Sequence, residues 1–244
     1  MKIEIAVMLV MSFGVMAIQA QESMEKDVIK TSAGNLEITF IGHGSLMMAF
    51  EGKIIHVDPY SRQADYSKLP KADLILLTHD HPDHLDPVAL RYVRTSQTMV
   101  VLPPICASKV PGGIVMTNGG VQTIMGITVE AVPAYNLVHK RDNGQAFHPK
   151  GEGNGYVLTF GDKRIYVAGD TENTPEMKAL KQIDCAFLPM NLPYTMTPEM
   201  VADAAKAFSP KILYPYHYGD TPPAKLRDLL KDRPDIEVRI RRMK

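Results

Sequence analysis

The alternation of hydrophobic and polar positions predicts a domain built from strand hairpins and strand–helix units. The runs at 35–44 and 52–60 predict two strands with a turn at Glu51-Gly52. Hairpins are predicted at 121–134 and 155–170, further strands at 72–77, 98–104, 184–190, 211–219 and 236–241, and helices at 87–94, 174–182, 197–208 and 223–233. Because hairpins open each half and helices then alternate with strands, we expect one α/β domain over residues 35–244.

The amino-terminal segment carries the pattern of an export signal. Lys2 is followed by an apolar run from Ile5 to Ile18, and then by small and polar residues. This run is shorter than the roughly 20 apolar residues of a membrane-spanning helix, so it favours a secretory signal peptide over residues 1–20. An uncleaved amphipathic helix or membrane anchor is the alternative. We expect Gln21 to begin the mature protein in the periplasm or outside the cell, without stable membrane insertion, and residues 21–34 to form a polar linker.

Composition narrows the class of protein. The 244 residues are 45% hydrophobic and 22% charged, which is enough for a sizeable core. The formal net charge is zero, which argues against a nucleic-acid-binding protein and favours a small-molecule substrate as the partner. Cys106 and Cys185 could pair in an exported protein, but Cys185 lies in an apolar stretch. Two unpaired buried thiols are therefore the simpler interpretation.

One short stretch concentrates groups that bind metals. Residues 78–86, "THDHPDHLD", directly follow a predicted buried strand. His79 and His81 are two positions apart, so on an extended backbone their side chains point to the same side. Asp83 and His84 follow after a proline. Three imidazoles and a carboxylate in one loop predict a site for one or two transition metals, rather than a merely solvated loop.

The same stretch resembles a known signature. The run from His79 to His84 is similar to the H-x-H-x-D-H motif of the metallo-β-lactamase superfamily, and the similarity extends along nearly the whole mature chain. "FIGHGS" and "HVDPY" resemble the branch that contains ascorbate-6-phosphate lactonase and related metal-dependent hydrolases. The resemblance implies a four-layer αββα sandwich with the site at one rim of the sheets. It also implies a first metal on His79 and His81, a second metal on Asp83, His84 and His217, and Asp170 as a bridge.

One position departs from this resemblance. Relatives carry a further first-metal histidine in a P-A-x-H segment, whereas residues 133–136 read "PAYN" and end in Asn136. An amide oxygen is a poor ligand for zinc. His139 and His148 lie downstream in the irregular stretch 136–156. We favour His148 as the substitute ligand or as a substrate contact, with an exposed loop histidine as the alternative, and we expect His139 to be solvated.

Residues at the ends of the early strands are candidates for supporting roles. A metal-bound histidine commonly donates its other ring nitrogen to a carboxylate, and Asp58 could accept such a bond. His43 could support a ligand or face the substrate, and Asn136 is a candidate for the same two roles. His56 lies on the same strand face as Asp58 and is expected to be a core residue.

The implied chemistry is metal-dependent hydrolysis. Two divalent ions, zinc before manganese or iron, would activate a hydroxide that attacks an ester, lactone, amide or phosphodiester. Asp83 or Asp170 would move the proton, and Lys140, Arg141 and Lys150 point to a small anionic substrate. A non-catalytic metal-binding protein with a degenerate first site is the main alternative. A redox di-iron enzyme is the other, although the intact Asp83 and the lack of a flavin-binding domain favour hydrolysis.

Overall fold

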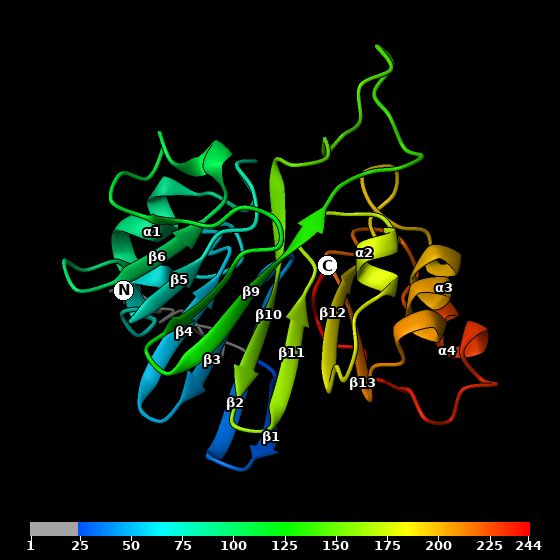
Figure 1. Ribbon diagram of the computed structural model, residues 1–244, viewed down its shortest axis with the longest axis horizontal. Helices are drawn as coiled ribbons and strands as arrows, with labels where there is room; N and C mark the ends of the chain where they lie inside the picture. Colours follow the sequence, from blue (N-terminus) through cyan, green and yellow to red (C-terminus); the bar gives the residue numbers. More distant parts are fainter. Residues whose placement is uncertain (1–23) are drawn as a thin grey trace, which may run out of the picture.

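The computed structural model describes residues 24–244 and contains two seven-stranded sheets (Figure 1). The first sheet has the order β1 (Lys26–Thr31), β2 (Gly34–Gly42), β3 (Ser45–Phe50), β4 (Lys53–Val57), β5 (Leu74–Leu76), β6 (Met99–Leu102) and β7 (Ile114–Val115). The second has the order β14 (Glu237–Val238), β13 (Ile212–Tyr216), β12 (Cys185–Pro189), β11 (Lys163–Val167), β10 (Gly153–Phe160), β9 (Ile127–Ala134) and β8 (Val121–Ile124).

Each half of the chain builds its sheet in the same way. Strands β1 to β4 pair antiparallel, and β4 to β7 then pair parallel. In the second half β8 to β11 pair antiparallel, and β11 to β14 pair parallel. Parallel pairs need crossover connections, which here carry α1 (Pro87–Val93), α2 (Pro175–Lys178), α3 (Pro198–Phe208) and α4 (Lys225–Leu229). The prediction of hairpins followed by strand–helix alternation is confirmed.

Three apolar clusters define four layers. The central cluster joins side chains of both sheets, such as Phe40 and Phe187, whose ring centroids lie 6.1 Å apart. A second cluster packs the carboxyl-terminal helices on the second sheet, and a third packs α1 on the first sheet. Figure 1 shows the helices outside and the sheets between them. The αββα sandwich expected from the sequence is therefore present.

Two of the helices begin with matched capping residues. Asp86 precedes α1 and its carboxylate accepts a hydrogen bond from the Val88 N–H, while Thr197 does the same for the Met200 N–H at the start of α3. Each cap is followed by proline, whose fixed φ suits the first helical position. The cap at Asp86 fixes the end of the histidine-rich loop, because this residue is also the last of residues 78–86.

The linker predicted at 21–34 is wrong over residues 26–31, because β1 occupies Lys26–Thr31. This edge strand is mostly exposed and buries only Ile29 deeply, so its sequence lacks apolar alternation. Its position depends on distant partners: Asp27 accepts hydrogen bonds from Tyr214 at 2.6 Å and Arg241 at 2.7 Å. Such long-range contacts leave no local sequence pattern.

Two further boundaries differ from the prediction. The apolar residues after Gly44 form a separate strand, β3, which the sequence interpretation did not distinguish from its neighbours. The irregular stretch expected at 136–156 ends earlier, because β10 begins at Gly153. Between β9 and β10 the chain projects beyond both sheets (Figure 1).

The remaining predictions on segments have different outcomes. Cys106 and Cys185 are buried and free, which confirms the unpaired interpretation. No helix within residues 24–244 has the length and apolar character to cross a bilayer. The predicted signal peptide lies outside the described residues, so cleavage before Gln21 stays a prediction that mass spectrometry of the mature protein can test.

Candidate metal centre

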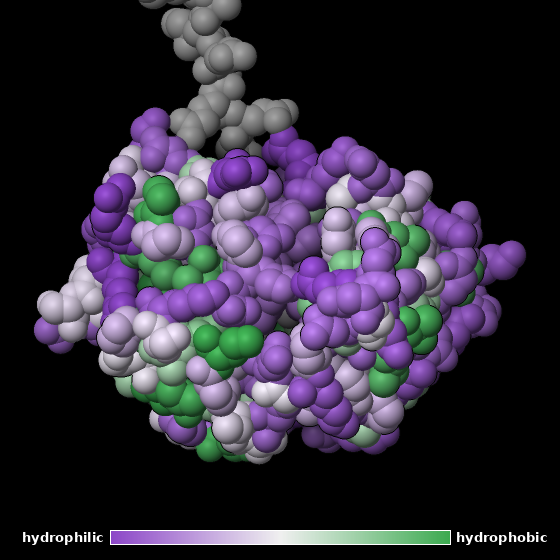
Figure 2. Space-filling model, turned by 90° about the horizontal axis from the view of Figure 1, so that it is seen from above, coloured by the Kyte–Doolittle hydropathy of each residue, from purple (hydrophilic) through white to green (hydrophobic). Residues whose placement is uncertain are grey.

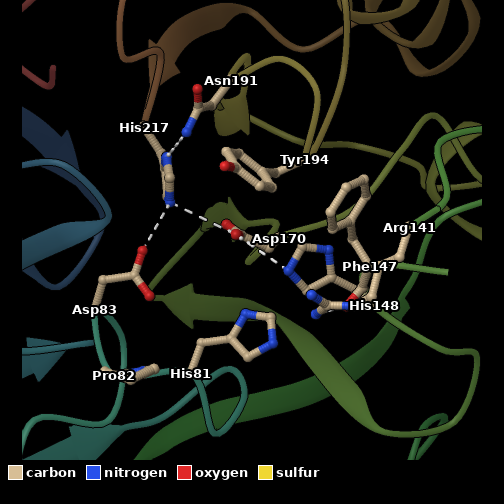
Figure 3. A pocket seen from close by; sticks show the side chains of 10 residues that line it. All are labelled: His81, Pro82, Asp83, Arg141, Phe147, His148, Asp170, Asn191, Tyr194 and His217. Atoms are coloured by element: carbon tan, nitrogen blue, oxygen red, sulfur yellow. Dashed lines mark hydrogen bonds and ion pairs between the residues drawn. The ribbon is translucent and has the colours of Figure 1, made fainter. Parts of the chain in front are cut away.

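The candidate ligands come from loops that follow strands of both sheets. The loop after β5 supplies His79, His81, Asp83 and His84. Asp170 follows β11, and His217 follows β13. Because the parallel strands of both sheets end at the same rim, these side chains meet over it. Figure 3 shows most of them directed into one cavity.

The ligand atoms form three overlapping groups. In each group one atom per residue lies within 4.8 Å of the others: His79, His81 and His148; His79, His84 and Asp170; and His43, Asp83, His84 and His217. The predicted ligands are therefore brought together, including His148, which is buried rather than exposed. Their roles as ligands remain predictions that the arrangement supports.

Asp170 lies close to histidines of all three groups. Its Oδ1 is 3.4 Å from His84 Nε2, and its Oδ2 is 3.3 Å from His148 Nε2 and 3.5 Å from His217 Nε2. Two ligands bonded to one ion at about 2.1 Å with a tetrahedral angle lie about 3.4 Å apart. The separations around Asp170 therefore suit ligands of common ions, and its position suits a bridge.

Buried polar atoms without hydrogen-bond partners gather at the same place. Among the described residues they include Nε2 of His79, His84, His148 and His217, and Oδ1 of Asp170. An unsatisfied buried polar atom costs about 1–3 kcal/mol. A cation at this point would give all these atoms a partner.

The other ring nitrogen of each histidine is held from outside. Nδ1 of His84 lies 2.7 Å from Asp58 Oδ2, and Nδ1 of His79 lies 3.0 Å from Thr78 Oγ1. Thr78 itself donates to Asp58 at 2.5 Å. One buried carboxylate therefore orients two imidazoles, and proton donation from Nδ1 leaves Nε2 free as a ligand. Asp58 has the supporting position that the sequence analysis gave it.

Asn136 holds His148 in the same way. Its Oδ1 accepts from the His148 N–H at 2.9 Å and from His148 Nδ1 at 2.7 Å. Its Nδ2 donates to Glu172 at 3.1 Å and to the Tyr194 carbonyl at 2.9 Å. A side-chain amide has two acceptor sites and two donors, and all four are used. Asn136 therefore supports His148 and has no capacity left for a metal or a substrate.

Glu172 is a functional residue that the sequence analysis missed. Its side chain is fully buried, and it accepts backbone N–H bonds from Leu137, Val138 and His139, each at 2.7 Å. Burial alone would raise the pKa of this carboxyl, but the hydrogen bonds from His139 and Asn136 hold it below the ordinary value. The resulting anchor fixes the loop that carries His148. The sequence signal is one acid placed two residues after Asp170.

His43 supports the opposite side of the site. Its Nε2 lies 2.9 Å from Asp83 Oδ2, and its ring contacts that of His217 with centroids 3.6 Å apart and planes tilted by 38°. His217 Nδ1 in turn lies 3.3 Å from the Asn191 amide. These contacts fix both Asp83 and His217, although part of the His43 side chain, 17%, still reaches solvent.

The carboxylates and imidazoles perturb one another. Burial opposes charge on Asp170, but His217 and His84 hold its pKa well below the ordinary value. Burial also opposes charge on His84, yet Asp170 and Asp58 hold its pKa well above the ordinary value. Burial and the neighbouring His84 lower the pKa of His79. The site therefore favours an anionic Asp170 and a neutral His79 imidazole, the ligand forms that divalent metals require, whereas a metal ion on His84 would have to replace the proton that Asp170 and Asp58 favour there.

Backbone strain marks the same rim. His43, Asp58 and His217 have φ values of 54°, 41° and 46°. Left-handed conformations are uncommon for residues other than glycine and cost about 1–3 kcal/mol each. All three residues directly follow strand ends. His217 lines the cavity, while Asp58 contacts His84 and His43 contacts Asp83 from outside it.

A cavity of about 420 Å³ opens above the ligands. It is lined by His81, Pro82, Asp83, Arg141, Phe147, His148, Asp170, Asn191, Tyr194 and His217. Of the three cations expected near the mouth, Arg141 lines the cavity, whereas Lys150 pairs with Glu176 at 2.8 Å and Lys140 is exposed.

His139 and His56 belong to none of the three ligand groups and contact other parts of the protein. His139 was expected to be solvated, but only 23% of its side chain is exposed, and its Nδ1 lies 2.7 Å from Glu172 Oε1. The buried Glu172 carboxylate draws it inward. His56 is fully buried with Nε2 3.1 Å from the Pro70 carbonyl, as expected of a core residue, and burial lowers its pKa to about 4.

Comparisons with known proteins identify the family. The beta-lactamase superfamily domain matches residues 37–217. A UPF0173 metal-dependent hydrolase of Methanopyrus kandleri is 30% identical over 199 residues, 77% of this chain and 86% of the relative. The crystal structure of a proposed metal-dependent hydrolase from Parabacteroides distasonis is 51% identical, with a TM-score of 0.87 over 91% of this chain and 100% of the other.

A more distant structure shares the fold. The metallo hydrolase Igni18 of Ignicoccus hospitalis has a TM-score of 0.69 at 22% identity, over 85% of this chain and 95% of its own. The resemblance to the lactonase branch in particular stays a prediction. With the domain match spanning most of the chain and curated relatives covered over most of their length, the chain belongs to the metallo-β-lactamase superfamily and is a metal-dependent hydrolase.

Proposed function

We propose that this hydrolase holds two divalent ions and cleaves an ester, lactone, amide or phosphodiester of a small anionic molecule. The observation that carries the proposal is the set of buried ligand atoms without hydrogen-bond partners around Asp170. They belong to the three overlapping ligand groups, and Asp170 lies within 3.5 Å of at least one histidine of each group. Such a donor set fits zinc, and it also accepts manganese or iron.

The arrangement supports one assignment of ligands. His79, His81 and His148 would hold the first ion, and Asp83, His84 and His217 the second, with Asp170 shared by both. Paired divalent ions of this kind lower the pKa of water towards about 7 and neutralise negative charge that develops on the reacting group. The position of His148 beside His79 and His81 disfavours non-catalytic metal binding, because it would complete the first site.

Asp83 is the better candidate to carry the proton. Its side chain is 33% exposed at the cavity floor, whereas that of Asp170 is 4% exposed and surrounded by imidazoles. The contact with His43 at 2.9 Å holds the Asp83 carboxylate in one orientation. A proton accepted by Asp83 can therefore pass to a leaving group in the cavity, while Asp170 stays in place as a bridge.

Arg141 supports an anionic substrate. Its guanidinium lies 5.1 Å from the Phe147 ring centroid, and no carboxylate within residues 24–244 lies at ion-pair distance from it. An unpaired cation at the mouth of a site favours a negatively charged group on the ligand.

Metal analysis together with a hydrolysis panel tests the proposal. We expect two zinc or manganese ions per chain, and hydrolysis of at least one anionic ester, lactone, amide or phosphodiester that stops on chelation and returns when metal is restored. Asp83→Asn should lower kcat strongly in protein that stays folded. One ion per chain without hydrolysis would instead support a binding protein, and iron with a visible absorption band would support redox chemistry.

A further inference from the structure

An apolar rim stands beside the charged floor of the cavity. Leu137, Val138, Leu192 and Tyr194 are large apolar residues with exposed fractions of 45%, 67%, 44% and 45%. They belong to two loops, 136–152 and 190–197, that meet at one side of the site. Figure 2 shows hydrophobic patches among the mostly hydrophilic side chains of the upper face, which bears these loops.

Two aromatic rings join the loops over the cavity. Phe147 comes from the first loop and Tyr194 from the second, with ring centroids 5.1 Å apart and planes at 79°. Both line the cavity, and Figure 3 places them on the side opposite His81 and Pro82. The two rings form an apolar wall of the cavity, while Leu137, Val138 and Leu192 belong to the same two loops outside its lining. An apolar wall within a polar site favours a ligand with a matching apolar group.

Hydrogen bonds make this wall rigid. The Tyr194 carbonyl accepts from Asn136 Nδ2 at 2.9 Å, and its N–H donates to the Asn191 carbonyl at 2.9 Å. Thr195 accepts from the Asn191 N–H at 2.7 Å, which closes the turn. The loop of Phe147 is fixed by Asn136 and Glu172. A prearranged aromatic surface binds a ligand without a large cost of ordering side chains.

We propose that Phe147 and Tyr194 form an apolar subsite that selects substrates with a compact hydrophobic group, such as an aromatic ring, next to the scissile bond. The inference rests on the proposed function, because it places the reacting group at Asp170 and the anionic group within reach of Arg141. It names the substrate class as an amphiphilic anion. A fully hydrophilic anion would leave both rings in contact with water.

Binding of two matched anions tests the subsite. Phenylphosphonate and methylphosphonate share the anionic group and differ in the ring, and isothermal titration of the metal-loaded enzyme measures both. Partial burial of a phenyl ring corresponds to roughly a tenfold gain in affinity, so we expect phenylphosphonate to bind about ten times more tightly. Phe147→Ala and Tyr194→Ala should each reduce this ratio towards one. Methylphosphonate affinity should be unchanged in Tyr194→Ala, whereas Phe147→Ala also removes the ring beneath Arg141 and is judged by the ratio alone.

Conservative and distant variants complete the design. Tyr194→Phe keeps the ring and should keep the preference, while Tyr92→Ala removes an exposed aromatic on α1 and should have no effect. An equal affinity of wild type for the two anions, with hydrolysis intact, overturns the subsite and leaves the proposed function standing. So does a preference that survives both alanine variants. If neither anion binds and no substrate of the panel is cleaved, the proposed function fails and the subsite with it.

Discussion

Replacement of His148 by alanine should empty the first metal position. His148 Nε2 lies 3.3 Å from Asp170 Oδ2, and it completes a group with His79 and His81. The Asn136 side chain contacts the ligand groups only through His148, whose N–H and Nδ1 both donate to Asn136 Oδ1. The two substitutions therefore remove different things, a direct ligand in one variant and its support in the other.

The magnitudes separate the two variants. Loss of a supporting residue typically lowers metal affinity about 10–100-fold, which is about 1.4–2.7 kcal/mol. We expect Asn136→Ala to fall in this range at the first position. His148→Ala loses a metal bond and should exceed 100-fold, so that about one ion per chain is retained after dialysis against a weak chelator.

Competition with a chromophoric chelator gives the affinities, and elemental analysis gives the stoichiometry. His139→Ala is the matched control, because it removes an imidazole of the same loop that belongs to none of the three ligand groups. Full metal content and affinity in His148→Ala, with loss in Asn136→Ala, would refute the assignment and make the amide the ligand.

Three further results are expected. Glu172→Gln should weaken the hydrogen bonds from the backbone N–H groups of residues 137–139 by about 2 kcal/mol, which corresponds to roughly 30-fold faster amide hydrogen exchange at these residues. Unchanged exchange would contradict the role of Glu172 in fixing this loop. Asp27→Asn should lower the free energy of unfolding by about 2 kcal/mol at pH 7. Burial opposes the charge of Asp27, but Tyr214 and Arg241 hold its pKa below the ordinary value of 3.8. The stability difference between wild type and Asp27→Asn should therefore persist above pH 3.8 and vanish as the pH falls through the lowered pKa, and urea titrations at several pH values can follow it. Chelation should lower the melting temperature and added metal restore it, since a bound ion stabilises only the folded chain, and a melting temperature indifferent to metal would oppose a resident ion.

The fold was largely predictable because its signals are local. Hairpin turns at Gly126 and Gly161 and the caps at Asp86 and Thr197 are encoded within a few residues. The edge strand β1 was missed for the opposite reason. Asp27 is held by residues 187 and 214 positions away, and no window of the sequence displays such partners.

The candidate metal site also contains residues with a local sequence signal and residues without one. The ligands after β5 share one short motif, so the sequence alone could assign them, and Asp170 and His217 follow recognisable strands. Glu172 could not be identified, because its role consists of accepting backbone N–H groups from a loop more than thirty positions earlier. Every residue except proline carries a backbone N–H group, so these contacts produce no pattern of residue types in the sequence.

The proposed assignment of His148 gives Asn136 a role although it departs from the family motif. The family histidine would stand at the end of β9, where Asn136 now lies with all its donors and acceptors in use. In the proposed assignment the imidazole would come instead from His148, 12 positions later, whose Nε2 lies 3.3 Å from Asp170 Oδ2. The asparagine is then the residue that makes the substitution work, because a ligand carried on a projecting loop needs a fixed orientation to compete with one on a strand end. The position after β9 would then serve as the support of a ligand rather than as the ligand itself.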